Sequence, residues 1–281
     1  MNAFPDLTAF RALYPETCGT VAHSLSGHPM FELEALVALA ARMRPVDVEY
    51  NRGDLPVEVD PDASIGNGLG IEDTIRGIEE NGSWMVLKFV EQDAAYRDLL
   101  SSTLGALVPV VAPTTGAMLK QEGFIFISSP NSMTPFHFDP EHNILLQLRG
   151  TKAMTVFPAG DDTVVAGAEH ERFHAGGHRN LPWRDEIAPY GQTFELLPGD
   201  GLYVPVKAPH FVRNGPQVSV SFSITWRSEW SYRESEAHGM NAVLRRLGAN
   251  PRAPQRYPHD NHPKSIAYRA MRKLGGMFGA R

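Results

Sequence analysis

The chain has 281 residues, of which 42% are hydrophobic and 21% are charged, and its formal net charge is −6. This is the composition of an ordinary globular protein, and it excludes a disordered or fibrous chain. The one cysteine, Cys18, excludes an internal disulfide bond. No apolar run approaches the roughly 20 residues of a membrane-spanning helix, and the first residues lack the regions of a signal peptide. We therefore expect a cytoplasmic protein that does not contact membranes.

Residues 1–115 combine helical and strand patterns. Apolar residues at helical spacing predict a helix over 31–44. Further helices are predicted over 73–80 and 93–107, and between them the apolar run WMVLKFV at 84–90 predicts a buried strand. We expect this mixed N-terminal region to pack on a core formed by later residues.

Between residues 116 and 230, short apolar runs alternate with turn residues. Six runs predict strands, at 124–127, 143–148, 153–157, 192–197, 201–206 and 218–226. Several short strands with regular turns indicate a mainly β fold, a double-stranded β-helix or jelly roll, rather than alternating strands and helices. Residues 159–189 interrupt this pattern as an insertion with little periodicity.

Residues 231–281 return to helical patterns, around 234–247 and 263–278. From residue 241 onward nine Lys or Arg residues stand against one acid, so this segment carries +8 and residues 1–240 carry −14. A basic segment can contact phosphates or anionic lipid, but we favour a solvated helix face. The apolar side of the last helix needs a partner surface, first on its own domain and second in a homodimer.

The residues best suited to chemistry are His137, Asp139 and His210. Residues two apart in a strand point to the same face, so His137 and Asp139 can aim an imidazole and a carboxylate at one point. His210 follows a turn and a predicted strand, and it is the best third ligand. Two histidines and one carboxylate leave three metal positions open, as in non-haem Fe(II) oxygenases. Catalytic zinc with three protein ligands remains an alternative. If the residues bind no metal, His137 and Asp139 are a hydrogen-bonded pair at a strand end.

A longer motif surrounds these residues. Residues 134–152 follow the pattern T-P-x-H-x-D-x3-N-x3-Q-x2-G-x-K. This stretch resembles the cupin-like Jumonji C oxygenases, in particular the asparaginyl hydroxylase that acts on hypoxia-inducible factor and its bacterial relatives. The resemblance covers roughly residues 122–226. It implies a cupin-like jelly roll with Fe(II), 2-oxoglutarate as cosubstrate and O2, and a dioxygenase (hydroxylase) reaction that gives succinate and CO2.

The resemblance also implies roles for three further residues. Thr134 and Lys152 fall where the family binds the distal carboxylate of 2-oxoglutarate, and Asn143 falls where an amide holds the cosubstrate near the metal. A buried anion needs a cation and hydrogen-bond donors, which agrees with these roles. The alternative for Lys152 is a solvent-facing lysine on an edge strand.

The chain departs from the family at two positions. A family tyrosine upstream has no counterpart in the strand at 84–90, which offers Trp84, Lys88 and Phe89 instead. An asparagine after the second histidine is replaced, and Ser221 is the residue that we place there. These positions stay unassigned.

A second histidine cluster lies at His170, His174 and His178. On a helix His170 and His174 would share one face, which can bind zinc. Because Gly176-Gly177 breaks helices, we predict a polar surface loop instead.

Two other functions remain open. The chain can be a non-catalytic, regulatory cupin-like module that binds a metal or a small acid, or it can be a zinc hydrolase or isomerase. The prime substrate, a protein side chain or a small molecule, is not defined by the sequence. No helix-turn-helix pattern is present, so we do not expect nucleic-acid binding.

Overall fold

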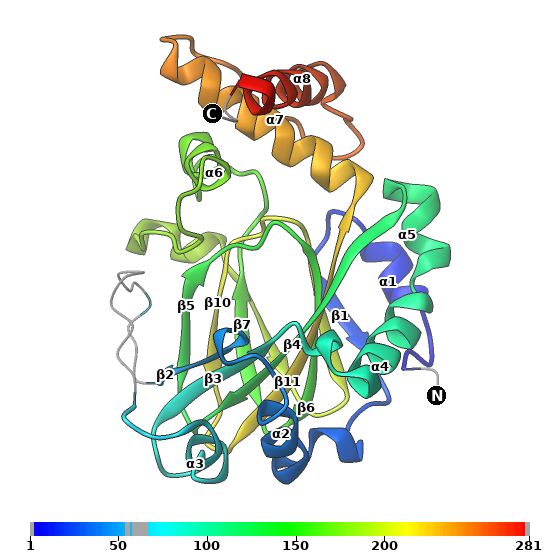
Figure 1. Ribbon diagram of the computed structural model, residues 1–281, viewed down its shortest axis with the longest axis vertical. Helices are drawn as coiled ribbons and strands as arrows, with labels where there is room; N and C mark the ends of the chain where they lie inside the picture. The colour runs from blue at the N-terminus through cyan, green and yellow to red at the C-terminus, as the bar shows by residue number, and fades with distance from the viewer. Residues whose placement is uncertain (1–2, 54–56, 58–66, 279–281) are drawn as a thin grey trace.

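The computed structural model describes residues 3–53, 57 and 67–278, with side chains described up to residue 274. Two antiparallel sheets form a sandwich with helices around it (Figure 1). In the described part of the chain no helix is both long and apolar enough to cross a membrane.

The larger sheet has seven strands in the order β1-β9-β6-β11-β4-β3-β2. Its N-terminal strands β1, β2 and β3 lie toward the two edges of a sheet whose centre is formed by the later strands β6, β11 and β4. In sheet order the strands are β1 (Gly19–Ala22), β9 (Asp200–Val204), β6 (His142–Arg149), β11 (Ser219–Ser228), β4 (Met118–Ser128), β3 (Ser83–Lys88) and β2 (Val48–Arg52).

The smaller sheet has four strands in the order β5-β10-β7-β8, and its neighbouring strands all pair antiparallel. They are β5 (Met133–His137), β10 (His210–Asn214), β7 (Lys152–Val156) and β8 (Gln192–Leu196). With the larger sheet it forms a jelly-roll sandwich, which confirms the predicted fold class.

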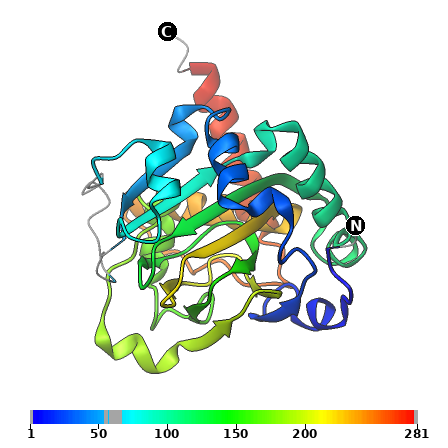
Figure 2. The same cartoon turned by 90° about the horizontal axis from the view of Figure 1, so that it is seen from below.

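Helices cover the outer face of the larger sheet. Figure 2 shows α2 to α5 on one side of the sandwich and the insertion on the opposite side. The helices of the N-terminal half are α1 (Thr8–Leu13), α2 (Leu33–Ala40), α3 (Ile71–Arg76), α4 (Ala94–Gly105) and α5 (Val108–Thr115). One-turn 3-10 helices join them at η1 (Pro29–Phe31), η2 (Pro45–Asp47) and η3 (Val90–Gln92). The helix α4 begins at Asp93, whose carboxylate accepts the backbone N–H groups of Ala95 and Tyr96 and so caps the helix.

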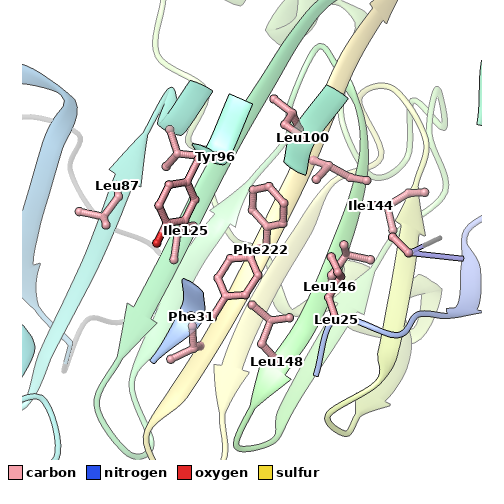
Figure 3. Close-up of a cluster of buried hydrophobic side chains, with 14 of the residues drawn as sticks. Leu25, Phe31, Leu87, Tyr96, Leu100, Ile125, Ile144, Leu146, Leu148 and Phe222 are labelled. Carbon is pink, nitrogen blue, oxygen red and sulfur yellow. The ribbon is translucent and has the colours of Figure 1, made fainter. Parts of the chain in front are cut away.

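The main hydrophobic core lies between these helices and the larger sheet (Figure 3). Strand β11 shows how the sequence sets this arrangement. Its apolar residues alternate with hydroxyl residues, and Val220, Phe222, Ile224 and Trp226 belong to the outer core. Period-2 alternation sends the intervening serines and Thr225 to the opposite face, into the space between the sheets. Strand β11 is therefore apolar on its outer face and polar on its inner face, whereas Leu145, Leu202 and Val204 of the neighbouring strands add apolar side chains to the space between the sheets.

The insertion covers the outer face of the smaller sheet. Phe136 and Phe138, on either side of His137, pack with Phe157 and with Leu181 and Ile187 of the insertion. The insertion contains α6 (Gly167–His174) and η4 (Asp185–Tyr190), so it forms helical turns although its sequence shows little periodicity.

Two helices complete the chain. The helix α7 (Glu229–Arg246) begins with a capping box between Ser228 and Ser231, and α8 (His262–Phe278) packs against it. Both lie beyond the sandwich, next to α6 (Figure 1). The predicted helices at 31–44, 73–80 and 93–107 all form, each shorter than expected, and the six predicted strands are present.

Candidate metal centre

The three predicted ligands converge at one end of the smaller sheet. His137 ends β5 and His210 begins β10, and the register pairs the two residues directly. Their ring centroids lie 4.2 Å apart. Asp139 follows two residues after β5, and its Oδ2 lies 3.8 Å from Nε2 of each histidine. One ligand atom from each residue lies within 4.8 Å of the others, which is a spacing that can hold a metal ion.

Backbone carbonyls fix both imidazoles in the same tautomer. Nδ1 of His137 lies 2.7 Å from the carbonyl oxygen of Pro135, and Nδ1 of His210 lies 2.9 Å from that of Ala208. Each Nδ1–H therefore donates to a carbonyl two residues earlier, and each Nε2 presents its lone pair to the site. Burial lowers the pKa of both rings, and for His137, with the added effect of His210, to about 3. Both are neutral near pH 7, the form that binds a metal.

Asp139 is held as a carboxylate. Burial alone would raise its pKa, but the nearby Arg179 guanidinium and the two imidazoles lower it below the usual value. Arg179 donates to Oδ1 at 2.7 Å, so Oδ2 remains directed at the histidines. The backbone N–H of Lys207 donates to the Asp139 carbonyl oxygen at 2.8 Å. Two neutral imidazoles and one carboxylate fit a divalent metal of the iron group with open positions.

A β-bulge places Thr134 with His137. In the β5–β10 register, His137 stands opposite His210 and Thr134 opposite Val212. Between these pairs two residues of β5, Pro135 and Phe136, stand opposite one residue of β10, Phe211, so the bulge turns Thr134 to the same face as His137. Strict alternation would have sent it to the opposite face. Val212 belongs to the cluster between the sheets, and this identifies the shared face as the inner one.

Lys152 is buried on the same inner face without an ion-pair partner. It stands opposite Asn214 at the start of β7, and its neighbours on that face, Met154 and Val156, belong to the inner cluster. The residue is 4% exposed, and within the described residues no acid or hydrogen-bond acceptor contacts its ammonium. Burial lowers its pKa to about 7. The alternative of a solvent-facing lysine is wrong.

The facing sheet contributes polar side chains to the same space. Asn143 of β6 is buried, and its Oδ1 accepts the Ser223 hydroxyl at 2.8 Å, which leaves its amide N–H groups available. Ser221 donates to Gln147 Oε1 at 2.7 Å. This serine, which we place at the family's asparagine, thus contacts a neighbouring side chain of the inner face.

Trp84 is a polar group of the inner face to which the sequence analysis gave no role. It lies on β3, its neighbours Met85 and Leu87 belong to the outer core, and its ring lies 6.1 Å from that of Phe126. Its indole Nε1 is buried, and among the described residues it has no hydrogen-bond partner. The signal was available, because alternation along WMVLK sends Trp84 and Met85 to opposite faces. The alternation VSVSFSITW in β11 likewise marks a polar inner lining.

The predicted polar surface loop holds for His178, which is exposed after the end of α6, but it is wrong for His170 and His174. His170 and His174 lie on α6, which ends at His174, just before the two glycines. Their rings pack beside His238 of α7, with centroid distances of 5.2 and 5.7 Å. Burial lowers the pKa of His170 to about 2 and also lowers that of His174. The rings are therefore neutral and enclosed. In the described part of the chain they do not form a second group with converging ligand atoms.

Comparison with known proteins agrees with this architecture. A family described as the cupin-like domain matches residues 85–232, slightly more than half of the chain. The chain belongs to the cupin-like domain family.

Within this family the chain is similar to Jumonji C domain-containing protein 5 of Drosophila melanogaster. The two are 32% identical over 105 residues, 34% of this chain and 26% of that protein, so the chain spans about a quarter of that relative's length at this match. The X-ray structure of E. coli ycfD aligns over 98% of this chain and 68% of that one, with 16% identity and a TM-score of 0.51.

A second structure of the same Escherichia coli protein gives the same coverage, identity and TM-score. It is described as a ribosomal oxygenase in complex with cobalt and 2-oxoglutarate. At this identity the likeness shows a shared fold. The resemblance to Jumonji C proteins, inferred from residues 134–152, is confirmed by the family and by the Drosophila relative.

Proposed function

We propose that this cupin-like chain is an Fe(II)- and 2-oxoglutarate-dependent oxygenase. The observation that carries the proposal is the pairing of two sites on one inner face. The metal-competent group of His137, Asp139 and His210 lies at one end. At the other end of the β7–β10 strand pair lies Lys152, a buried ammonium without an acid partner in the described chain. A dicarboxylate that reaches from a metal to a cation fits this arrangement.

Each residue has a defined task in this proposal. The imidazoles of His137 and His210 and Oδ2 of Asp139 would hold the ion, and Arg179 keeps the other oxygen of Asp139 occupied. Lys152 and Thr134 would bind the distal carboxylate of the cosubstrate, and the free amide hydrogens of Asn143 would donate to its other end. Bound iron would supply the redox chemistry with O2 that couples oxidation of 2-oxoglutarate to oxidation of a C–H bond.

For the prime substrate we propose a protein or peptide side chain, with hydroxylation as the reaction. The support comes from relatives: the Escherichia coli protein with the same fold is described as a ribosomal oxygenase. A fold-level likeness is an analogy and not a property of the site. A small-molecule substrate is the alternative. Incubating the protein with a peptide library and, separately, with a set of metabolites separates the two, because only the true class of substrate should stimulate succinate release.

Turnover of 2-oxoglutarate in the anaerobically iron-loaded protein tests the proposal once air is admitted. We expect slow formation of succinate without a prime substrate, and loss of at least 100-fold in the His137→Ala variant. Full succinate production by that variant would contradict the ligand assignment. Tight binding of 2-oxoglutarate without turnover would instead indicate a regulatory module. Retention of zinc with indifference to 2-oxoglutarate would indicate a hydrolase on the same three ligands.

A further inference from the structure

One short turn controls two of the three proposed metal ligands. It joins β9 to β10 and contains Lys207 and Ala208. The backbone N–H of Lys207 donates to the carbonyl oxygen of Asp139 at 2.8 Å. The carbonyl of Ala208 accepts Nδ1–H of His210 at 2.9 Å and so sets its tautomer. A displacement of this turn would therefore move the carboxylate and one imidazole together.

The turn is held in an unfavourable backbone conformation. Lys207 has a φ of +57°, in the left-handed region, although it is not a glycine. That conformation is energetically unfavourable for a residue with a side chain, because its Cβ comes too close to the following carbonyl oxygen. It persists where surrounding contacts over-determine it, and such positions cluster at functional sites.

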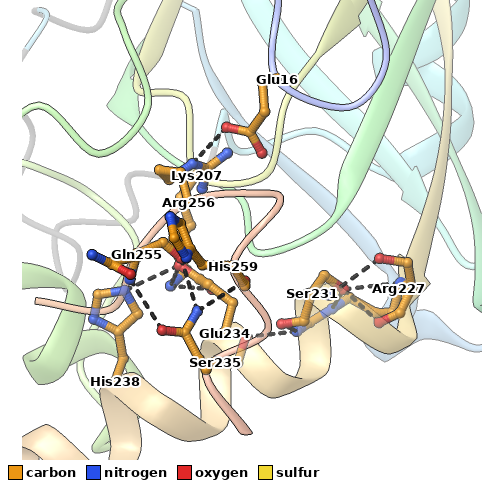
Figure 4. Close-up of polar contacts among 12 residues, drawn as sticks. Glu16, Lys207, Arg227, Ser231, Glu234, Ser235, His238, Gln255, Arg256 and His259 are labelled. Atoms are coloured by element: carbon orange, nitrogen blue, oxygen red, sulfur yellow. Dashed lines mark hydrogen bonds and ion pairs between the residues drawn. The ribbon is translucent and has the colours of Figure 1, made fainter. Parts of the chain in front are cut away.

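The contact that holds Lys207 in this backbone conformation is a buried ion pair with the helix α7. Nζ of Lys207 lies 2.7 Å from Oε1 and 2.7 Å from Oε2 of Glu234. The two side chains are 1% and 3% exposed. Glu234 also accepts Nε2–H of His238 at 3.0 Å, one turn further along α7 (Figure 4). Glu234 lies beyond residue 232, where the family match ends.

A buried ion pair of this kind is a poor source of stability. Removing two charges from water costs several kcal/mol per ion, and their attraction rarely gives a net gain over apolar residues of the same size. Removing one partner alone is strongly destabilising, because it leaves a buried charge. Such a pair instead fixes the position of the lysine side chain, because both carboxylate oxygens of Glu234 lie 2.7 Å from the Lys207 ammonium.

We propose that Glu234 is a positioning residue for the metal centre. It holds Lys207, and Lys207 fixes the turn that orients Asp139 and His210. The helix α7, most of which lies beyond the matched domain, would thereby set the geometry of the ligands. The inference rests on the proposed role of His137, Asp139 and His210 as metal ligands.

A double variant tests this inference, because Lys207→Met with Glu234→Leu removes both charges and preserves side-chain volume. The matched control is Arg233→Met, on the same helix, which removes the ion pairs of Arg233 with Asp260 and Glu229, neither of which involves the turn. Thermal unfolding of the metal-free proteins reports the fold. Anaerobic titration with Co(II) reports affinity, and the visible spectrum of bound cobalt reports ligand geometry.

We expect the double variant to fold, to bind Co(II) at least tenfold more weakly than the wild-type chain, and to show a changed cobalt spectrum. The control should match the wild type in both readings. If the double variant does not fold, Glu234→Asp decides the question: it keeps the charge, withdraws it by one methylene, and should shift the spectrum likewise.

The inference is overturned if the double variant folds and keeps the wild-type Co(II) affinity and cobalt spectrum. Where the double variant does not fold, the same result for a folded Glu234→Asp variant overturns it. In both cases the proposed function still stands. A wild-type chain that binds no Co(II) overturns both. Because the readings need no 2-oxoglutarate and no turnover, a failure of the oxygenase proposal at a later step is distinguishable from a failure of the inference.

Discussion

Lys152 and His210 lie on one inner face of the smaller sheet, four residues apart in register: His210 stands opposite Val156, and Lys152 stands opposite Asn214 at the other end of the same strand pair. Their separation along the sheet gives a two-ended ligand a metal at one end and a cation at the other.

Lys152→Met should weaken binding of 2-oxoglutarate by about 10- to 100-fold, because a charge-assisted hydrogen bond contributes about 1.5–3 kcal/mol. The matched ligand is 2-oxopentanoate, which lacks the distal carboxylate and should bind wild type and variant alike. Calorimetric titration of the metal-loaded proteins measures both. Equal losses for the two acids would show that Lys152 supports the fold and does not contact the carboxylate.

The pH dependence of the ligand-free protein follows from the same residue. Lysine ordinarily has a pKa of 10.5, and burial lowers that of Lys152 to about 7. Between these values the unfolded chain binds more protons than the folded one, so this residue makes the free energy of unfolding rise with pH. Denaturant unfolding between pH 7 and 10 should show this rise, and the Lys152→Met variant should lack that part of it.

Affinity for 2-oxoglutarate should change in the opposite direction. The carboxylate needs the protonated ammonium, so above about pH 7 binding must take up a proton. The dissociation constant should then rise by up to about tenfold per pH unit. Titrations at pH 6.5, 7.5 and 8.5 measure the slope, with the Lys152→Met variant as the flat reference. A constant affinity across this range in the wild type would contradict the assignment.

Trp84→Phe should lower affinity for 2-oxoglutarate about 5- to 10-fold, because the buried indole N–H has no partner in the described chain and alternation along β3 places the side chain on the inner face of the larger sheet. Trp183→Phe is the matched control, since that indole donates to Asp185 in the insertion, on the outer side of the smaller sheet. The affinities of the variant for 2-oxoglutarate and for 2-oxopentanoate are then compared. A loss for 2-oxoglutarate alone shows that the distal carboxylate is the group affected. Identical results for both tryptophan variants would exclude this role.

Phe222→Ala should destabilise the fold by about 3–5 kcal/mol, because this fully buried ring packs against Phe31 in the outer core and its loss leaves a cavity. Chemical denaturation measures the change. Leu247→Ala, at a side chain that is 79% exposed, should remain within about 0.5 kcal/mol of the wild type. A small effect at Phe222 would mean that the helix layer repacks around the gap.

Most of the fold could be predicted from periodicity, because the long strands and the N-terminal helices bury one face each. Strands β1 and β2, which form the two opposite edges of the larger sheet, were missed, and so was β10, because each has only four or five residues and pairs with distant parts of the chain. The placement of Thr134 beside His137 could not be derived from alternation, because it depends on a bulge. The resemblance supplied it instead.

The buried histidines show a different limit. Gly176-Gly177 does end the helix, as their sequence predicts, but only after His174. Burial of His170 and His174 comes from α7, whose His238 lies more than 60 positions further along the chain. No local pattern reports such packing. The ion pair of Lys207 with Glu234 was invisible for the same reason.

The alternation in β11 has a consequence for how this scaffold can change. The residues that hold the larger sheet to its helices project outward, whereas Ser219, Ser221, Ser223 and Thr225 project inward and contribute little apolar burial. Folding and ligand choice therefore draw on separate sets of side chains within one strand. Randomising the four inward hydroxyl positions should yield many well-folded variants. Some of these variants should bind dicarboxylic acids that are shorter or longer than 2-oxoglutarate.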